Sequence, residues 1–400
     1  MRVGTFANQR FAIAEMNRKQ EAIGRLQSEV SSGRQLLKPS DNPAQVAAVE
    51  NLNASIQRLD QYKQNALQVE QRLNQEESVL DNLTNTLQRI RELSIAANNG
   101  LVNDGSLKAY RFELGELRNQ LLDYANTRTA TGEYLFSGAK DRSKPFSLSG
   151  TEVRYNGDQT RKLVQISDSR KVADTSTGDE LFQRIINGNG AFSIAANPAN
   201  TGAGIIGDDS VTDPARFTGA HYEITFSSAS QFDVVNTDTG ATVLSGQSFS
   251  DGAPIRFDGV EVAISGQPDS GDRFTISPSR NEDMFSIVNR FFDALSTKPD
   301  SARERARYHQ QIGLVMADLD QALNHVSATR GELGAKLKYI DNTRAENESA
   351  NIVLQRTRSR IQDTDLASAI SSLQAESTSL DALRQSYIQF GSKTLFDYLR

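Results

Sequence analysis

Both ends of the chain carry apolar residues at the spacing of a helical seam. These residues recur about every seven positions in polar surroundings, the pattern that a helix presents to other helices in a coiled coil. The two seams consist of Met16, Ile23, Leu26 and Val30, and of Leu366, Ile370, Leu373, Leu380 and Tyr387. Because Thr394 is polar, the second seam shifts to Leu395. We predict that these residues form an assembly interface that neighbouring subunits complete.

Longer seams of the same kind lie between the terminal ones. One runs from Val49 to Ala97 and the other from Ile312 to Leu354, and the second is expected to continue unbroken into the terminal helix. Leucine stripes are more often an intramolecular core than an interface, so we expect these two seams to pack together within one chain. The segment "SSGRQLLKPSDNP" (31–43) predicts a break and a new helix start, since it contains Gly and Pro.

The hydrophobic period changes to two between residues 145 and 283. This segment holds 15 of the 27 Gly and 6 of the 9 Pro, and its 19 acidic and 10 basic residues give a net charge of −9. Asp258-Gly259 predicts a tight hairpin, and "NTDTG" (236–240) predicts a longer hairpin loop. We interpret the segment as an inserted β domain in which the Gly- and Asn-rich stretch 187–210 is poorly ordered.

The sequence therefore predicts a mainly α protein with an inserted β domain. Its N- and C-terminal thirds would form a long antiparallel coiled-coil core. The predicted division is an N-terminal assembly helix (1–43), a first part of the helical core (44–145), an outer β domain (146–282), a second part of the helical core (283–355) and a C-terminal assembly helix (356–400).

Composition excludes several classes of function. The chain has no Cys, so disulfides, thiolate metal sites and Cys nucleophiles are absent. A net charge of −6 argues against nucleic acid as the general partner. No stretch approaches the run of about 20 apolar residues that a membrane helix needs. We also expect no cleavable signal peptide, because the first twenty residues lack an uninterrupted apolar segment.

The candidate catalytic motifs are weak. "GAGIIG" (202–207) matches the dinucleotide fingerprint, but Asp208 and Asp209 would put negative charge where phosphate should lie, so we expect a loop. His221, His309 and His325 lie far apart and belong to no HExxH motif. Asp208/Asp209 and Glu282/Asp283 lack the spacing of a ligand series. We expect a protein without catalytic residues, cofactor or metal.

Two terminal segments resemble a known family. "RLQSEVSSGRQLLKPSDNPAQVAAVENL" (25–52) and "RTRSRIQDTDLASAISSLQAESTSLDALRQSYIQ" (356–389) resemble the terminal signatures of flagellin. "GEYLFSGAKDRSKPF" (132–146), "YNGD" (155–158) and the ending "SKTLFDYLR" are more similar to hook-associated proteins of the hook–filament junction, the FlgL type. The segment "IRFDGVEVAISGQPDSGDRFTISPS" (255–279) is similar to hook-associated proteins in general.

The resemblance implies a flagellin-like fold and a structural adaptor between another hook-associated protein and flagellin. It implies a homo-oligomeric ring or helical layer, an export chaperone, and export through the flagellar type III apparatus to the extracellular flagellum. It implies no nucleic-acid or membrane partner. Three alternatives stay open at this point: flagellin itself, a coiled-coil tip protein of an injection apparatus, and an enzyme carried in the β insertion.

Overall fold

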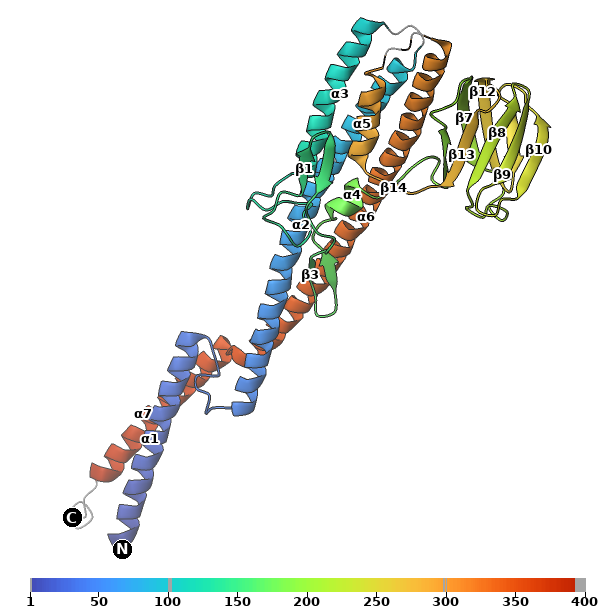
Figure 1. Cartoon of the computed structure of the whole chain (residues 1–400). Helices are drawn as coiled ribbons and strands as arrows, with labels where there is room; N and C mark the ends of the chain where they lie inside the picture. Colours follow the sequence, from blue (N-terminus) through green and yellow to red (C-terminus); the bar gives the residue numbers. More distant parts are fainter. Residues whose placement is uncertain (1, 100–102, 298, 300, 393–400) are drawn as a thin grey trace, which may run out of the picture. The chain divides into compact units, whose positions relative to one another are not determined.

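The chain forms two units, of which one joins the two ends of the sequence and the other is a continuous segment. The computed structural model describes residues 2–99, 103–297, 299 and 301–392 (Figure 1). We call 1–64 with 342–400 the terminal unit and 65–341 the central unit. Among the described residues, no helix is long and apolar enough to cross a membrane.

Long helices build most of the first and last thirds of the chain. The helices in chain order, including the short α4 of the middle third, are α1 Arg2–Ser32, α2 Pro43–Ala97, α3 Asp104–Ala125, α4 Gly178–Phe182, α5 Met284–Ala294, α6 Ala302–Gln362 and α7 Leu366–Ser392. Gly33 ends α1 with a φ of 69°, in the left-handed region that glycine adopts without strain. The expectation of an unbroken terminal helix is wrong, because α6 ends at Gln362. The Asp365 carboxylate caps α7 by accepting the backbone N–H groups of Ala367 and Ser368.

The strands form antiparallel sheets with short connections. They are β1 Phe146–Ser149, β2 Glu152–Tyr155, β3 Leu163–Gln165, β4 Lys171–Ala173, β5 Ile185–Ile186, β6 Phe192–Ala196, β7 Ala203–Val211, β8 Tyr222–Ser228, β9 Gln231–Asn236, β10 Thr242–Ser248, β11 Pro254–Phe257, β12 Val260–Gln267, β13 Arg273–Pro278 and β14 Asn281–Glu282. The sheet orders are β1-β2, β10-β9-β8-β13-β6, β11-β12-β7, β14-β5 and β3-β4. The predicted Asp258-Gly259 hairpin is confirmed, with φ angles of 42° and 81° between β11 and β12.

The predicted helical seams are buried in the central unit. α2 and α6 run antiparallel there, since Glu77 pairs with Arg330 and Arg91 with Asp320, at 2.6 and 2.5 Å. The seam residues that lie in this core are Ala66, Leu73, Leu80, Leu87, Ile90, Leu93, Ile312, Leu319, Val326, Leu333 and Ile340. The interface between the two helices therefore supplies much of the hydrophobic stabilisation of this unit.

The predicted β domain 146–282 divides between two hydrophobic cores. Its first part belongs to the core of the helices, through Phe146, Ile166, Val172, Leu181, Phe182 and Ile185. Its later strands surround a separate core that includes Phe192, Tyr222, Phe226, Val260 and Phe274. We call the helices of the central unit with β1–β5, α4 and β14 the helical body, and residues 192–278 the β module. The predicted range is therefore not one compact body, because short hairpins with the same composition as the module pack onto the helices instead.

Strand β7 corrects two further expectations. "GAGIIG" lies in β7, which pairs with β12, so it is a strand and not a loop. The stretch 187–210 contains β6 and most of β7, so it is ordered. Backbone pairing with β12 and β13 fixes the conformation of this stretch, although its Gly-rich composition does not indicate strands.

Glu76 is a fully buried carboxylate on α2. It accepts the backbone N–H of Ser176 at 3.1 and 3.3 Å, and it thereby anchors the segment before α4 to α2. Burial raises the pKa of Glu76 above its ordinary value of 4.5, although the bond from Ser176 and the charge of Lys336 act in the opposite direction. The folded chain consequently holds this proton to a higher pH than the unfolded chain does.

We predict that Glu76→Gln changes how stability depends on pH. Since the native state binds the extra proton, the free energy of unfolding of the wild type should fall as pH rises from about 4.5 through the raised pKa. The variant has no such proton, so its stability relative to the wild type should grow over this window and then level off. Urea unfolding at several pH values measures this difference. The exposed substitution Glu152→Gln is the control, and a pH-independent difference for Glu76→Gln would contradict the prediction.

Candidate assembly surface

The terminal helices pack against each other within the terminal unit. α1 and α7 lie side by side and run antiparallel (Figure 1). Lys19 Nζ lies 2.6 Å from Glu376 Oε2, and this ion pair marks the register. Since both helices rise equally per residue, Met16 lies near the level of Leu380. The two predicted terminal seams thus face each other inside one chain.

Two aligned breaks in the helices hold this pair in register. The backbone N–H of Thr364 donates to the Gly33 carbonyl at 3.0 Å, and the N–H of Gln35 donates to the Gln362 carbonyl at 2.9 Å. The Gln35 side chain adds a bond from Nε2 to the Ile361 carbonyl at 2.7 Å. These bonds satisfy backbone groups that both helix ends would otherwise leave unpaired. The end of α1 is therefore tied to the end of α6 and to the link that precedes α7.

Helix α7 is apolar over a wider arc than α1 covers. On the side of Glu376, Ala369 and Leu380 are buried, at 6% and 5% exposure. On an adjacent stripe, Ile370 and Ile388 are 44% and 66% exposed. These two isoleucines are 18 residues apart, which is five helical turns, so they point in the same direction. Polar residues such as Ser377 and Arg384 lie between them, so a further helix could contact either isoleucine but would not meet a continuous apolar surface.

The predicted interface residues fall into four groups. Met16, Ile23, Leu26, Val30, Leu373 and Tyr387 are half-buried, and Leu380 is buried. Leu366 and Ile370 are exposed. Leu395 lies outside the described residues. The role of the whole set in assembly stays a prediction, but the exposed pair on α7 is the part that a neighbouring molecule could contact directly.

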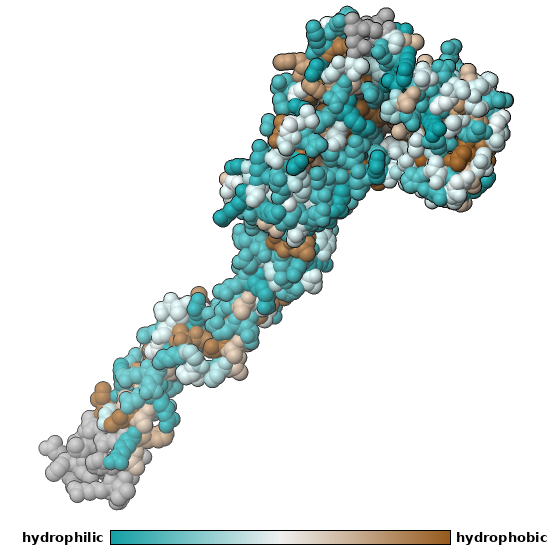
Figure 2. All heavy atoms as spheres, in the orientation of Figure 1, coloured by the Kyte–Doolittle hydropathy of each residue, from teal (hydrophilic) through white to brown (hydrophobic). Residues whose placement is uncertain are grey.

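The heptad argument missed other exposed apolar side chains of the terminal unit. Phe11, Ile13, Ile352, Val353 and Ile388 are all exposed. Figure 2 shows apolar side chains interrupting the hydrophilic surface over the part of the chain that holds α1 and α7. A search at the helical period of 3.6 residues would have placed Ile388 on the face of Ile370, whereas a strict period of seven does not.

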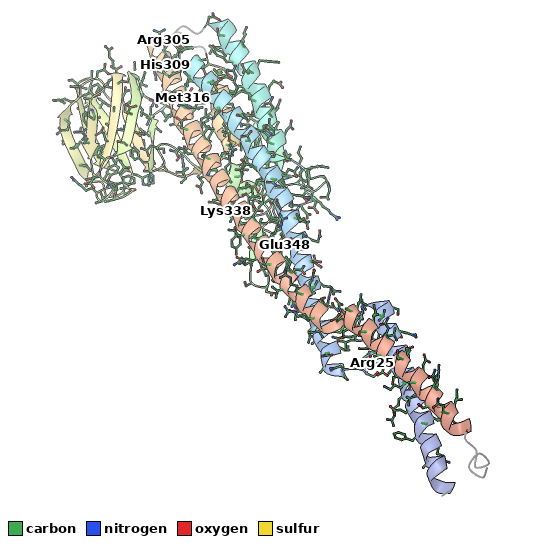
Figure 3. The ribbon with its side chains drawn as sticks, turned by 180° about the vertical axis from the view of Figure 1, so that it is seen from behind. Arg25, Arg305, His309, Met316, Lys338 and Glu348 are labelled. Carbon is green, nitrogen blue, oxygen red and sulfur yellow. The ribbon has the colours of Figure 1, made fainter. Side chains whose placement is uncertain are left out.

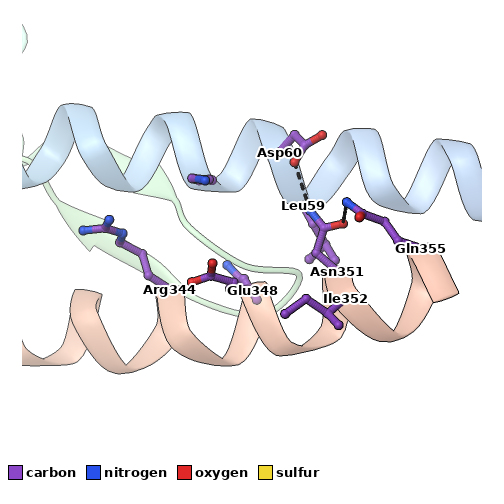
Figure 4. Close-up of a pocket in the computed structure, with 9 residues that line it drawn as sticks. Leu59, Asp60, Arg344, Glu348, Asn351, Ile352 and Gln355 are labelled. Carbon is purple, nitrogen blue, oxygen red and sulfur yellow. Dashed lines mark hydrogen bonds between the residues drawn. The ribbon is translucent and has the colours of Figure 1, made fainter.

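A polar groove of about 460 Å³ separates α2 from α6 in the terminal unit (Figure 4). Asn351 Nδ2 donates to Asp60 Oδ1 at 3.0 Å, and Gln355 Nε2 donates to Asn351 Oδ1 at 2.8 Å. The lining residues are Leu59, Asp60, Lys63, Arg344, Asn347, Glu348, Asn351, Ile352 and Gln355. Charges of both signs line it, and its lining offers no pair of nucleophile and base. It marks the place where polar residues replace the apolar seam.

The remaining candidate residues have separate structural partners. His221 lies 3.0 Å from Asp238, His309 contacts Asn98, and His325 contacts the Glu180 carbonyl. Asp283 caps α5, and Glu282 pairs with Arg290 at 2.9 Å. Asp208 and Asp209 lie on β7. In the portion of the chain that the structure covers, no three His, Asp or Glu side chains gather as metal ligands would.

Comparison with known proteins connects this architecture to the bacterial flagellum. The family model "Bacterial flagellin N-terminal helical region" matches residues 3–141, and "Flagellar hook-associated protein 1, D2-like domain" matches residues 195–278. The second match covers most of the Gly- and Asn-rich stretch 187–210. The first match defines the class, a protein with a flagellin-type N-terminal helical region.

Solved structures narrow the class to one family. The crystal structure of FlgL from Xanthomonas campestris is 34% identical, covers 76% of this chain and 98% of its own, and has a TM-score of 0.69. The flagellar junction protein FlgL from Legionella pneumophila is 33% identical over 79% and 100%, with a TM-score of 0.70. The chain belongs to the FlgL family of flagellar hook-associated proteins.

Curated relatives agree but match over a shorter length. Flagellar hook-associated protein 3 of Escherichia coli K12 is 31% identical over 157 residues, which is 39% of this chain and 49% of that protein. The chain thus spans about half the length of the curated relatives it matches. Flagellins match at lower identity, for example 24% for that of Salmonella montevideo.

Proposed function

We propose that this chain is a non-enzymatic structural adaptor that joins the hook-associated zone of the flagellum to the flagellin filament. Leu366 and Ile370 carry the proposal, because these apolar side chains are exposed one turn apart at the start of α7, where α1 leaves them uncovered. Neighbouring apolar side chains that stay exposed in the single chain mark candidate sites of association. Membership of the FlgL family supports a place at the junction, and the lower identity to flagellins gives no support to a filament subunit.

The proposal also names the partners of the chain and assigns a role to each of its segments. The segments 1–43 and 356–400 are assembly helices that contact further copies, a second hook-associated protein on one side and flagellin on the other. The parts 44–145 and 283–355 form the supporting helical core, and the β module faces outwards. An export chaperone holds the chain before export through the flagellar type III apparatus, without a cleavable signal peptide, to the extracellular flagellum.

A deletion strain tests the adaptor role. Cells that lack this chain should build hooks, fail to grow filaments and release flagellin into the medium. Electron microscopy of the cells and immunoblots of the medium measure both effects, and expression of the wild-type chain should reverse them. Normal filaments in the deletion strain would contradict the proposal.

We predict that Ile370→Asp abolishes this rescue while the isolated chain stays as stable as the wild type. A charge buried without a partner in a helix interface is costly, but Ile370 is exposed in the single chain, so only assembly should suffer. Filament counts in the complemented strain and urea unfolding of the purified chain measure the two effects.

Two further substitutions on α7 serve as controls. Ser371→Asp introduces the same charge on the adjacent, exposed position, about 100° around the helix, and should still support filaments. Leu380→Asp places the charge in the buried contact with α1, so it should weaken the terminal pair of the isolated chain. If Ile370→Asp also lost stability, Ile370 would belong to the core of the single chain and not to an assembly surface.

A further inference from the structure

The β module and the helical body have separate hydrophobic cores. Residues 187–191 and 279–280 connect the two parts, and we call them the neck. The two sets of buried core residues share no member. In the neck, the backbone N–H of Asn187 donates to the Arg280 carbonyl at 3.1 Å, and the N–H of Arg280 donates to Asn187 Oδ1 at 2.9 Å. Each part thus has its own apolar interior, and the neck crosses between them as two hydrogen-bonded strands.

Beyond the neck, the module is held by one polar stripe on α6. Arg307 Nη2 donates to the carbonyls of Pro198 and Asn200, the latter at 3.1 Å. Gln310 Oε1 accepts the backbone N–H of Ile206 at 2.6 Å. Together with Asp318, which accepts the N–H of Gly188 in the neck at 2.8 Å, these side chains recur at three- and eight-residue steps, so they lie along one side of the helix. We call Arg307, Gln310 and Asp318 the docking stripe.

The docking stripe differs from the apolar seam of the same helix. Ile312, Val315 and Leu319 on α6 are buried in the helical core, while the docking stripe makes hydrogen bonds with the module and its neck. Helix α6 therefore carries two faces with different chemistry. The apolar face resists separation because it would expose hydrocarbon to water, whereas water can replace the bonds of the polar face.

Two cavities lie along the docking stripe, and its own residues contribute to their lining. One groove of about 240 Å³ is lined by residues such as Ala195, Pro198 and Leu314. A second of about 360 Å³ includes Ser193 and Arg290 in its lining. Protein interiors are close-packed, so a contact zone with this much open space is held by separate hydrogen bonds and not by continuous packing. Gln310 is buried, at 7% exposure, and its Oε1 accepts the backbone N–H of Ile206 on β7, an edge strand of its sheet.

We propose that the β module is a self-folding body that the docking stripe holds in one orientation, and that it can leave α6 without unfolding either part. Arg307 and Gln310 act as positioning residues for the module. Asp318 also pairs with Arg290 of α5 at 2.5 Å, so it belongs to the helical body as well and is left unchanged in the test. The inference concerns the isolated chain and does not depend on assembly.

The test is a fluorescence transfer measurement on the full chain. The wild type has no Cys, so Lys338→Cys on α6 and Ser245→Cys on β10, both at exposed positions, provide unique sites for two dyes. The wild-type background should give one narrow population of transfer efficiency. Adding Arg307→Ala and Gln310→Ala should produce a second, broad population, while circular dichroism and the resistance of the module to protease stay unchanged.

A matched pair of substitutions completes the experiment. Arg305→Ala with Gln311→Ala removes the same two residue types at exposed positions of α6, of which Arg305 is labelled in Figure 3. This control should keep the single narrow population. The inference is overturned if the docking variant also keeps it, if the control shifts equally, or if the docking variant loses the fold of the module.

Discussion

Removing residues 188–279 and joining Asn187 to Arg280 through Gly-Gly is expected to leave the helical body folded, with a urea unfolding midpoint close to that of the intact chain. β5 pairs with β14 with Ile186 opposite Asn281, and Asn187 and Arg280 form the next hydrogen-bonded pair. Two residues are the commonest connection of such a hairpin, so the excision should replace the module by a tight turn. Circular dichroism during urea titration measures the midpoint.

A longer excision is the contrasting case. Removing 147–280, which follows the boundaries suggested by composition, should destroy the helical body. It deletes the buried core residues Ile166, Val172, Leu181, Phe182 and Ile185. Truncating a large buried side chain costs about 2–5 kcal/mol, and the total stability of a domain is about 5–15 kcal/mol. Equal stability of the two excised chains would show that β1–β5 and α4 do not support the helices.

The contrast between these excisions shows where sequence patterns suffice and where they do not. The seam through Leu73, Leu80 and Leu319 was predictable, because a helix buried along one side must repeat its apolar residues at the helical period. The boundary of the module was not. Phe146 and Phe182 sit among Gly, Pro and acidic residues just as the module strands do, and only their tertiary contacts assign them to the helical core.

The candidate site was predictable in part for a related reason. Heptad spacing identified the face on which α7 meets α1, including Leu380, since a close helix pair repeats its contacts about every seven residues. It did not separate that face from the exposed stripe of Ile370 and Ile388, because the division depends on how much of the arc α1 covers. No sequence pattern indicated the docking stripe on α6. Arg307 and Gln310 look like ordinary polar residues of a solvated helix, and only their contacts with the module identify them.

Phe182→Ala is expected to lower the free energy of unfolding of the central unit by about 3–5 kcal/mol. Phe182 is fully buried, and its ring centroid lies 5.5 Å from that of Phe136, 5.1 Å from Phe146 and 6.0 Å from Phe285. Its loss would leave a cavity among these rings and remove aromatic contacts that connect α4 to β1 and α5. Urea unfolding of the variant measures the change.

Phe112→Ala is the matched control, because Phe112 is 75% exposed on α3 and the same truncation there should change stability by only about 0.5 kcal/mol. A further variant, Phe182→Leu, fills much of the space and should lie between the two. The size of the Phe182→Ala effect bears directly on the fold. If α4 were only a connector on the way to the β module, Phe182→Ala would resemble Phe112→Ala. A loss several times larger means that the short helix α4 completes the helical core, and that the chain must return from β4 to that core before the β module begins.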